Sequence, residues 1–351
     1  MNPIRAWNAF WFRPTSAKPL AAIRILFGLL VLCNLAFISV DLDYWFTDTG
    51  LLQGSESKFV AGPLRQSPFQ YWQDPTTVRA GFAVVAAIAA AYTVGWRTRT
   101  MGVLLYLGLV SIHHRNVVTS SGADVLLITF AFNLMLAPAG AAWSLDARKR
   151  DRLRGTLAEP LIIPWAQRLI QVQISLIYTV ASVLKAHGVN WLNGSALHLV
   201  LNNAEVRRFD FSFLTQYPEL INLMTYSALA IEFGLAIVIW FRAARPWILL
   251  AGVALHTGIF FTINIPIFGE LMMVGYLAFL TPEEFNHMMA CLDVRRWFRR
   301  APAPAAAIAA SPPAVLPIDA RADGPSEFWG PHQVDTAWGA ASEPEFADAE
   351  A

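Results

Sequence analysis

The sequence contains little charge for its length. Lys, Arg, Asp and Glu make up 15% of its 351 residues, whereas a soluble domain usually carries about 25%. Hydrophobic residues make up 56%, and they come in long blocks rather than in alternating patterns. This composition predicts an all-α, polytopic transmembrane helical bundle in contact with a lipid bilayer. The net charge of +1 gives no sign of a nucleic-acid partner.

The sequence is also poor in cysteine and in the motifs of soluble enzymes. We place Cys33 inside the first span and Cys291 on the cytoplasmic side, so no disulfide is expected between them. Metal-ligand spacing, a nucleotide-binding loop and a nucleophile elbow are all missing, and no metal site is expected. Because the first apolar run has no small-residue cleavage site behind it, we expect a retained signal anchor.

The apolar runs predict a transmembrane helical domain over residues 20–285 with about eight spans. The spans are expected near residues 20–40, 76–96, 101–118, 123–142, 165–184, 220–240, 246–264 and 268–280. The last run is short for a hydrocarbon core of roughly 30 Å, so a tilted span, a buried helix and half of a broken helix are all open. Between spans, residues 41–76 and residues 185–218 are expected to form external loops with short helices.

Three further segments flank this domain. Residues 1–19 are aromatic and basic, which is typical of a segment lying in the headgroup zone. Residues 286–300 form a basic interfacial segment. Residues 301–351, rich in Pro and Ala and then acidic, have too little apolar surface to fold, so we predict a disordered cytoplasmic tail.

The distribution of Lys and Arg gives the orientation. When alternate loops are separated, one side of the membrane receives 16 of these residues and the other side 7. The positive-inside rule then places the richer side, which includes both termini, in the cytoplasm. Two termini on one side require an even number of spans, which eight satisfies. The predicted localisation is the cell membrane, as a multi-pass protein.

Several ionisable residues fall within the predicted spans or at their ends. Those at the outer half are His113, His114, Arg115, Asp124, Lys185 and His187. Glu232 and His256 lie deeper, where such side chains need internal partners. A poorly solvated lysine can act as a base, and a neighbouring His or Asp can orient it. The candidate catalytic residues are therefore Lys185 as base, with His114, Asp124 and His256 as supporting groups.

The residues at the predicted outer face also have simpler interpretations. The run from His113 to Asn116 could be solvated at the membrane interface. Asp124 follows Ser and Gly residues and could favour a helix N-terminus, where a carboxylate suits the helix dipole. Lys185 could extend along the end of its span to reach the headgroups.

The residues at deeper positions have structural alternatives as well. Arg24, one turn into the first span, is expected to snorkel to the interface, with a buried partner as the alternative. Glu232 and His256 could pair with each other or with Arg24 and thereby fix the arrangement of the bundle.

Five stretches of the sequence, in this order, resemble the HTTM family, the membrane domain shared by vitamin K-dependent gamma-glutamyl carboxylase and many bacterial proteins. They are RPTSAKPLAAIRILFGLLV, GWRTRTMGVLLYL, SSGADVLLITFAFNLMLAPAGAAWSLDA, QVQISLIYTVASVLKAHGVNWLNGSAL and ALHTGIFFTINIPIFGELMMVGYLAFL. The resemblance extends over roughly residues 10–285 and implies the helical membrane fold of that family.

The resemblance also implies a chemistry. In the carboxylase, a lysine at the end of the corresponding span, shortly before a tryptophan, deprotonates vitamin K hydroquinone. Lys185 precedes Trp191 in the same way, with one residue more between them, and Asp124 lies where the carboxylase has an Asn-Asn-His stretch. This implies an enzyme that acts on a lipophilic quinone-like or redox partner, with a quinone as cofactor.

Two other functions are open. One is a non-catalytic membrane accessory protein that helps a neighbouring membrane or exported protein to mature. The other is a transporter, for which a water-filled path around Glu232 and His256 is expected.

Overall fold

The computed structural model of the protein describes residues 2–155 and 159–293. Across these residues the fold is all-helical, with fifteen α-helices, four short 3-10 helices and one two-stranded sheet. Residues 294–300 of the predicted basic segment 286–300 and the whole of the predicted tail 301–351 lie outside the described residues.

A helix occupies the position of each of the eight predicted spans. These helices are α2 (Lys18–Val40), α5 (Pro75–Val94), α6 (Thr98–Arg115), α7 (Gly122–Leu136), α9 (Trp165–Ala186), α12 (Pro218–Ile237), α13 (Arg245–Thr262) and α14 (Phe268–Tyr276). By length and composition, α2, α5, α9 and α12 together with η3 (Val238–Trp240) could cross a membrane. The number of crossings and the side on which the termini lie stay predictions.

Shorter elements connect these helices. Before α9 they are α1 (Pro3–Phe12), β1 (Thr15–Ser16), α3 (Leu42–Phe46), α4 (Gly54–Ala61), η1 (Pro68–Gln70), α8 (Leu145–Arg154) and β2 (Leu161–Ile162). After α9 they are α10 (Val189–Leu192), α11 (Ala196–Asn202), η2 (Ser212–Gln216), η4 (Leu277–Phe279) and α15 (Pro282–Leu292). The short helices expected in the two long loops are thus present. β1 pairs with β2 in antiparallel register, which ties the N-terminal segment to the chain just before α9.

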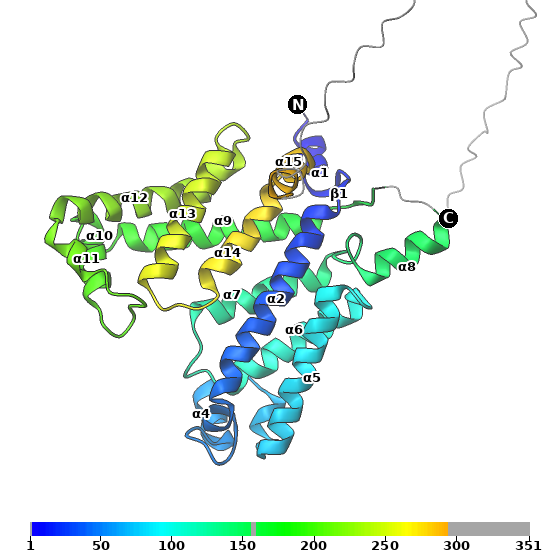
Figure 1. Ribbon diagram of the computed structural model, residues 1–351, viewed down its shortest axis with the longest axis horizontal. Coiled ribbons are helices and arrows are strands. Elements are labelled where there is room, and N and C mark those ends of the chain that lie inside the picture. Colours follow the sequence, from blue (N-terminus) through cyan, green and yellow to red (C-terminus); the bar gives the residue numbers. More distant parts are fainter. Residues whose placement is uncertain (1, 156–158, 294–351) are drawn as a thin grey trace, which may run out of the picture. The chain divides into compact units, whose positions relative to one another are not determined.

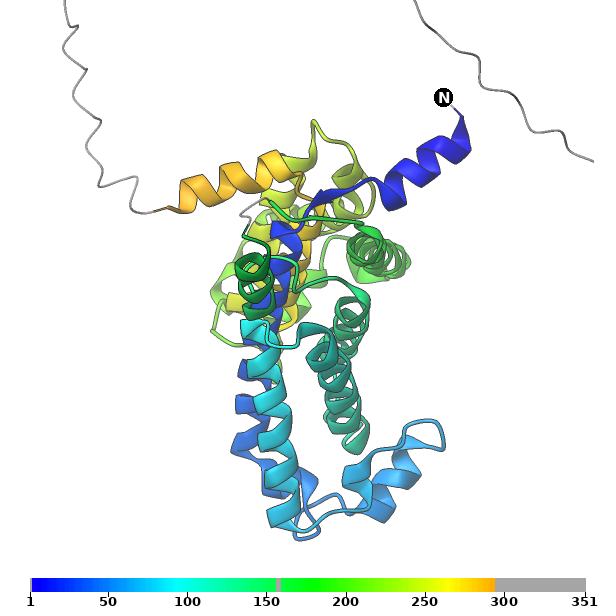
Figure 2. The same ribbon diagram turned by 90° about the vertical axis from the view of Figure 1, so that its right-hand side faces the viewer.

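Consecutive long helices pack against one another, and the series closes on itself. α2 packs against α5, and then come the pairs α5–α6, α6–α7, α7–α9, α9–α12, α12–α13 and α13–α14, after which α14 returns to α2. Figure 1 shows α9, α12, α13 and α14 together, and Figure 2 shows α2 alongside α5. The core between them is apolar, with fully buried residues such as Phe27, Phe130, Ile174 and Leu271.

Local sequence signals set the ends of α7. The Ser121 hydroxyl accepts a hydrogen bond from an amide of the first turn, and the Asp124 carboxylate accepts one from the Ser121 amide, which together form a capping box. The helix ends at Leu136, before the predicted limit at residue 142. The physical reason is Pro138, because a residue before proline avoids the helical region, and Ala137 is extended.

α13 and α14 form an antiparallel hairpin. His256 of α13 lies beside Gly269 of α14, and Gly252, one turn earlier, lies beside Tyr276. The chain reverses just before α14, where Ile267 has a left-handed conformation with φ of 69°. The last predicted span is therefore a separate helix that turns back on its predecessor, not the second half of a broken helix.

Arg24 is buried inside the bundle. Its side chain is 0% exposed, and its guanidinium donates hydrogen bonds to the carbonyl oxygens of Ala139, Ala142 and Trp143 at 2.5–3.2 Å. The expectation that Arg24 snorkels to the interface is wrong, because the loop after α7 brings three carbonyl acceptors to the guanidinium. Arg24 thereby holds that loop against α2.

Arg115, the last residue of α6, also holds a connecting segment in place. It is 0% exposed, and it donates hydrogen bonds to the carbonyl oxygens of Phe46, Leu52 and Phe69. His113 and Asn116 are buried as well, so the interpretation that the run from His113 to Asn116 is solvated at an interface is wrong for three of its four residues. The run instead anchors the segment between α2 and α5.

Candidate functional site

A bidentate ion pair joins α9 to α12. Lys185 Nζ donates to the two carboxylate oxygens of Glu232 at 2.7 and 2.6 Å. The two side chains are 26% and 10% exposed. Hydrogen bonds between charged groups at such distances are among the strong ones in proteins. The pair accounts for the carboxylate in the interior of α12, and the expected pairing of Glu232 with His256 or Arg24 is wrong.

The surroundings of the Lys185 amine are aromatic and apolar. Nζ lies 5.3 Å from the centroid of the Trp191 ring, which is within the range of a cation–π interaction. On the same end of α9 and on α10, Val183, Leu184 and Leu192 are exposed. A lipophilic molecule could therefore reach the amine from the apolar side without crossing the bundle.

A buried chain of hydrogen bonds links α9, α13 and α14. The Tyr178 hydroxyl is bonded to His256 Nε2 at 2.6 Å and also to the Tyr276 hydroxyl. These three side chains belong to residues that are 1–4% exposed. Among the residues that the structure describes, His256 Nδ1 has no hydrogen-bond partner. Such a chain of hydroxyls and imidazole can pass a proton between its members.

Tyr178 and Lys185 share one face of α9. They are two helical turns apart, and Ser182 lies between them on that face. Ser182 is 0% exposed, and its hydroxyl has no hydrogen-bond partner within residues 2–155 and 159–293. A line of polar groups thus runs from the His256 contact to the Lys185–Glu232 pair.

A second polar group joins α6 to α7. His113 Nδ1 lies 3.4 Å from a carboxylate oxygen of Asp124, whose other oxygen accepts from Ser121. The interpretation of Asp124 as a helix N-terminal residue is confirmed, and its side chain has this additional contact. His114 is half-buried, and its carbonyl oxygen accepts a hydrogen bond from Gln70.

The four candidate residues do not form one site in the structure. Lys185 and His256 both belong to the polar groups around α9. Asp124 belongs to the group between α6 and α7, where the histidine that it meets is His113 and not His114. No catalytic role follows from these positions alone.

The sequence analysis did not identify two residues of the buried hydrogen-bond chain that links α9, α13 and α14, which are Tyr178 and Tyr276. Tyr178 carried a signal, because its spacing from Lys185 places both on one helical face. Tyr276 carried none, because only the reversal of the chain before α14 brings it to Tyr178.

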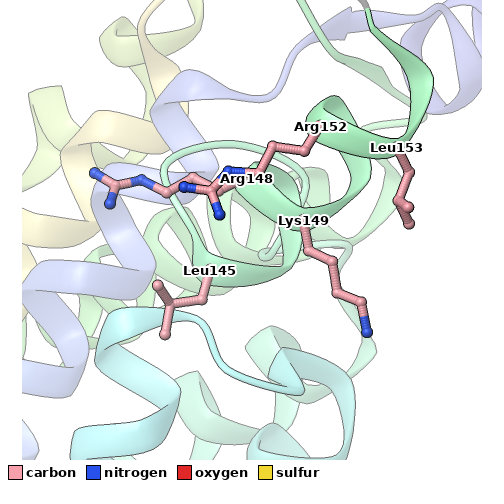
Figure 3. A pocket seen from close by; sticks show the side chains of 5 residues that line it. All are labelled: Leu145, Arg148, Lys149, Arg152 and Leu153. Carbon is pink, nitrogen blue, oxygen red and sulfur yellow. The ribbon is translucent and has the colours of Figure 1, made fainter.

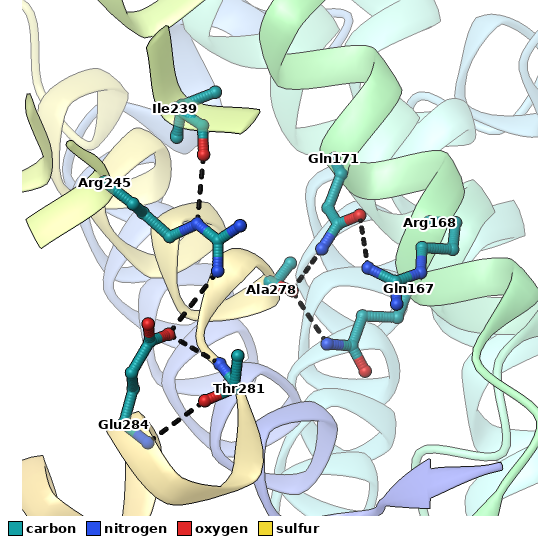
Figure 4. A network of polar contacts seen from close by, with 8 residues as sticks. All are labelled: Gln167, Arg168, Gln171, Ile239, Arg245, Ala278, Thr281 and Glu284. Atoms are coloured by element: carbon teal, nitrogen blue, oxygen red, sulfur yellow. Dashed lines mark hydrogen bonds and ion pairs between the residues drawn. The ribbon is translucent and has the colours of Figure 1, made fainter. Parts of the chain in front are cut away.

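At the opposite end of α9, a network of polar contacts has a structural role. Gln167 and Gln171 both donate to the carbonyl oxygen of Ala278, at 2.8 and 2.6 Å, and this holds η4 against α9 (Figure 4). Nearby, Arg245 lies 3.5 Å from Glu284, which caps the start of α15 (Figure 4). Apart from Gln167 Oε1, which has no hydrogen-bond partner among the described residues, these polar groups make structural contacts, so we assign them no chemistry.

The surface of α8 is basic. Arg148, Lys149 and Arg152, with Leu145 and Leu153, line a shallow pocket of about 290 Å³ (Figure 3). All five side chains are exposed. Such a surface suits contact with anionic headgroups, and the five side chains that line the pocket include no carboxylate or imidazole.

Asp146 fixes the start of α8 against α6. Its carboxylate accepts hydrogen bonds from the Arg97 amide and from the amide and hydroxyl of Thr98, at 2.7–2.9 Å. Burial raises the pKa of Asp146, but the hydrogen bonds from Thr98 and Arg97 outweigh it and lower that pKa below its ordinary value. The carboxylate is therefore ionised at neutral pH.

Comparison with known proteins gives one match. A family model described as the HTTM domain matches residues 12–283. This range contains both polar groups and all four candidate residues. No curated protein and no solved structure matches the chain. Within the described part of the chain, no group of three or more His, Cys, Asp and Glu side chains is placed to hold a metal ion.

Proposed function

Because this chain belongs to the HTTM domain family, we propose that it is an integral membrane enzyme whose Lys185–Glu232 pair removes a proton from a lipophilic quinol. The observation that carries the proposal is the bidentate pair at the end of α9, beside exposed apolar side chains. The quinol as substrate class comes from the resemblance to the vitamin K-dependent carboxylase, whose catalytic lysine also lies at the end of the corresponding span, one residue closer to its tryptophan.

The pair suits this reaction because it carries no net charge. When a quinol hydroxyl loses its proton, the O–H bond breaks, its electron pair stays on the oxygen, and the proton passes to the pair. Lys185 acts as base when the proton that it shares with Glu232 lies on the carboxylate. After the transfer, Glu232 is neutral and the Lys185 ammonium balances the new oxyanion. No uncompensated charge forms in the apolar surroundings, where it would be costly.

A neighbouring residue would assist this step. Trp191 offers a flat apolar surface next to the amine, against which a quinol ring could stack. On the inner side, Tyr178 and His256 lie beyond Ser182, whose hydroxyl has no hydrogen-bond partner among the described residues, so we give them no step in the transfer. Asp124 contacts His113 in the other polar group, so we give it no contact with the reacting hydroxyl.

The proposal is tested with purified full-length protein in lipid nanodiscs, a reduced naphthoquinone and oxygen, with quinol consumption as the readout. We expect Lys185→Met and Glu232→Gln to lower the rate about 100-fold or more, which is the usual contribution of a general base. Lys149→Met, on the surface of α8, is the matched control and should leave the rate unchanged. Turnover that Lys185→Met does not affect, or no turnover at all, would reject the proposal.

A second function is favoured by a specific observation, which is that each charge of the pair is already satisfied by the other. A pair of this kind can have a purely structural role, in which it sets the contact of α9 with α12. The protein would then be a non-catalytic membrane accessory that helps a neighbouring membrane or exported protein to mature. Retention of that neighbour on pull-down, with full biological activity of Lys185→Met, would favour this function over the enzyme.

The transporter is not proposed. It requires a water-filled path around Glu232 and His256, and His256 is 1% exposed. Its ring is packed against Phe268 and hydrogen-bonded to Tyr178.

A further inference from the structure

Two arginines lie side by side on the exposed face of α8. Arg148 and Arg152 are four residues apart, which places them one turn apart on the same side of the helix. Both are exposed, and Figure 3 shows their side chains extending in the same direction. The side chain of Lys149 extends away from them (Figure 3). The two guanidiniums therefore face one region of the surface.

Neither guanidinium has a countercharge. Among the described residues, Arg148 and Arg152 take part in no ion pair. The two carboxylates of α8 are engaged elsewhere, because Asp146 accepts hydrogen bonds from the start of α6 and Asp151 pairs with Arg150 at 3.0 Å. Like charges one turn apart destabilise a helix. An anion that bridges the two arginines would remove this repulsion.

Apolar side chains flank the two arginines. Leu145 and Leu153 line the same pocket and are 44% and 79% exposed. Together with Arg148 and Arg152 they occupy positions i, i+3, i+7 and i+8, which form one face of a helix. A soluble anion gains nothing from exposed leucines, whereas an amphiphile contacts both kinds of group. The combination favours an anionic lipid over a free anion.

The rest of α8 is fixed against the protein. Ala147, on the side opposite to the arginines, is 4% exposed, and its amide donates to the Ser144 hydroxyl at 2.8 Å. The arginines are therefore presented by a helix that is already packed. α8 belongs to the side of the membrane that the distribution of Lys and Arg predicts to be cytoplasmic, and the cytoplasmic leaflet carries anionic lipids.

We propose that Arg148 and Arg152 bind the phosphodiester of an anionic phospholipid such as phosphatidylglycerol, while Leu145 and Leu153 contact its acyl chains. Guanidinium groups suit this role because their planar fork donates parallel hydrogen bonds to phosphate oxygens. The proposal is independent of the function proposed above, because neither member of the Lys185–Glu232 pair lines this pocket.

The test titrates phosphatidylglycerol into the full-length protein in a neutral detergent and measures the lipid-bound fraction by native mass spectrometry. We expect saturable binding. Phosphatidylcholine should bind about tenfold more weakly or less, because the arginines repel its trimethylammonium group. Inorganic phosphate is the probe for a soluble anion, and millimolar phosphate should leave the binding of phosphatidylglycerol unchanged.

Single substitutions test the two contacts. We expect Arg148→Gln and Arg152→Gln each to weaken the binding of phosphatidylglycerol about fivefold. Lys149→Gln removes the same charge from the same helix and is the matched control, which should bind as the parent does. An equal loss of affinity in Lys149→Gln would show a diffuse attraction to the basic helix and would overturn the proposal.

Unfolding temperatures separate a lipid site from a structural contact. Since neither arginine has an ion-pair partner among the described residues, both variants should be as stable as the parent in phosphatidylcholine nanodiscs. In nanodiscs that contain phosphatidylglycerol, the parent should unfold at a higher temperature than either variant. A loss of stability without the anionic lipid, equal binding of phosphatidylcholine, or displacement of the lipid by inorganic phosphate would overturn the proposal as well.

Discussion

The Lys185–Glu232 pair leads to a quantitative prediction about stability. The perturbations are Lys185→Met and Glu232→Gln, singly and together. Each single change leaves one charge without its partner in a setting where the side chains are 26% and 10% exposed. The double change removes both charges and keeps side chains of similar length. The difference between its loss of stability and the sum of the two single losses is therefore the interaction energy of the pair.

The magnitude follows from the burial of the two side chains. Removing one partner of a fully buried ion pair costs about 3–5 kcal/mol. Lys185 is partly exposed, so an ammonium left alone can turn outward, and we expect Glu232→Gln to cost about 2 kcal/mol. Glu232 is more deeply buried, and we expect Lys185→Met to cost about 3 kcal/mol. The double variant should lose only about 2–3 kcal/mol, which leaves a coupling energy of about 2–3 kcal/mol.

The assay is equilibrium unfolding in mixed micelles, with the fraction of denaturing detergent varied and the free energy of unfolding as the readout. Arg79 and Asp43 form the matched control pair, since their side chains are 62% and 45% exposed. In that cycle, with Arg79→Met and Asp43→Asn, we expect a coupling below about 1 kcal/mol. Additive losses at the Lys185–Glu232 pair, within about 0.5 kcal/mol, would refute the inference that the bidentate contact stabilises the fold.

Three further predictions address the hairpin, α8 and the orientation. A methyl group at Gly252 would lie 2.7 Å from a buried tyrosine hydroxyl, so Gly252→Ala should lose about 1–3 kcal/mol in an unfolding assay, while Gly258→Ala, with open space around it, serves as control. Because folding lowers the pKa of Asp146, its contribution to stability is complete above the ordinary Asp pKa and is lost as pH falls through the lowered value. Unfolding temperatures from about pH 6 to about pH 3 should therefore fall more steeply for the parent than for Asp146→Asn. In a cysteine-free background, Lys149→Cys should react with an impermeant thiol reagent only after cells are opened, and Glu205→Cys should react in intact cells; the reverse pattern would contradict the predicted orientation.

The positions of the helices could be predicted because apolar length is a local signal. Each of the eight runs became a helix, and the early end of α7 was itself readable from Pro138. The burial of Arg24 was not readable. Its three acceptors are backbone carbonyl oxygens within residues 139–143. Every residue has such a carbonyl, so the sequence does not show which ones will accept from an arginine. The arginine alone was equally compatible with an interfacial position.

The candidate site shows the same division between local and distant signals. Lys185 and Glu232 were both recognisable as unusual charges, and the spacing of Tyr178 from Lys185 put the two on one face of α9. The pairing of Lys185 with Glu232 depends on how α12 is rotated against α9, which is decided by apolar packing along the whole contact. For the same reason, Asp124 met His113 although its neighbour His114 was as good a candidate by sequence.

The geometry of the pair also reconciles stability with chemistry. Lys185 has two contacts with the Glu232 carboxylate. When the proton shared by the pair lies on the carboxylate, one contact is an O–H that donates to the Lys185 nitrogen, and the other is an N–H that donates to the second carboxylate oxygen. A quinol hydroxyl can therefore take the place of one contact while the other still holds the pair together. The exchange replaces one hydrogen bond to the Lys185 nitrogen by another and separates no ions, which is why a pair that stabilises the fold can also take part in proton transfer.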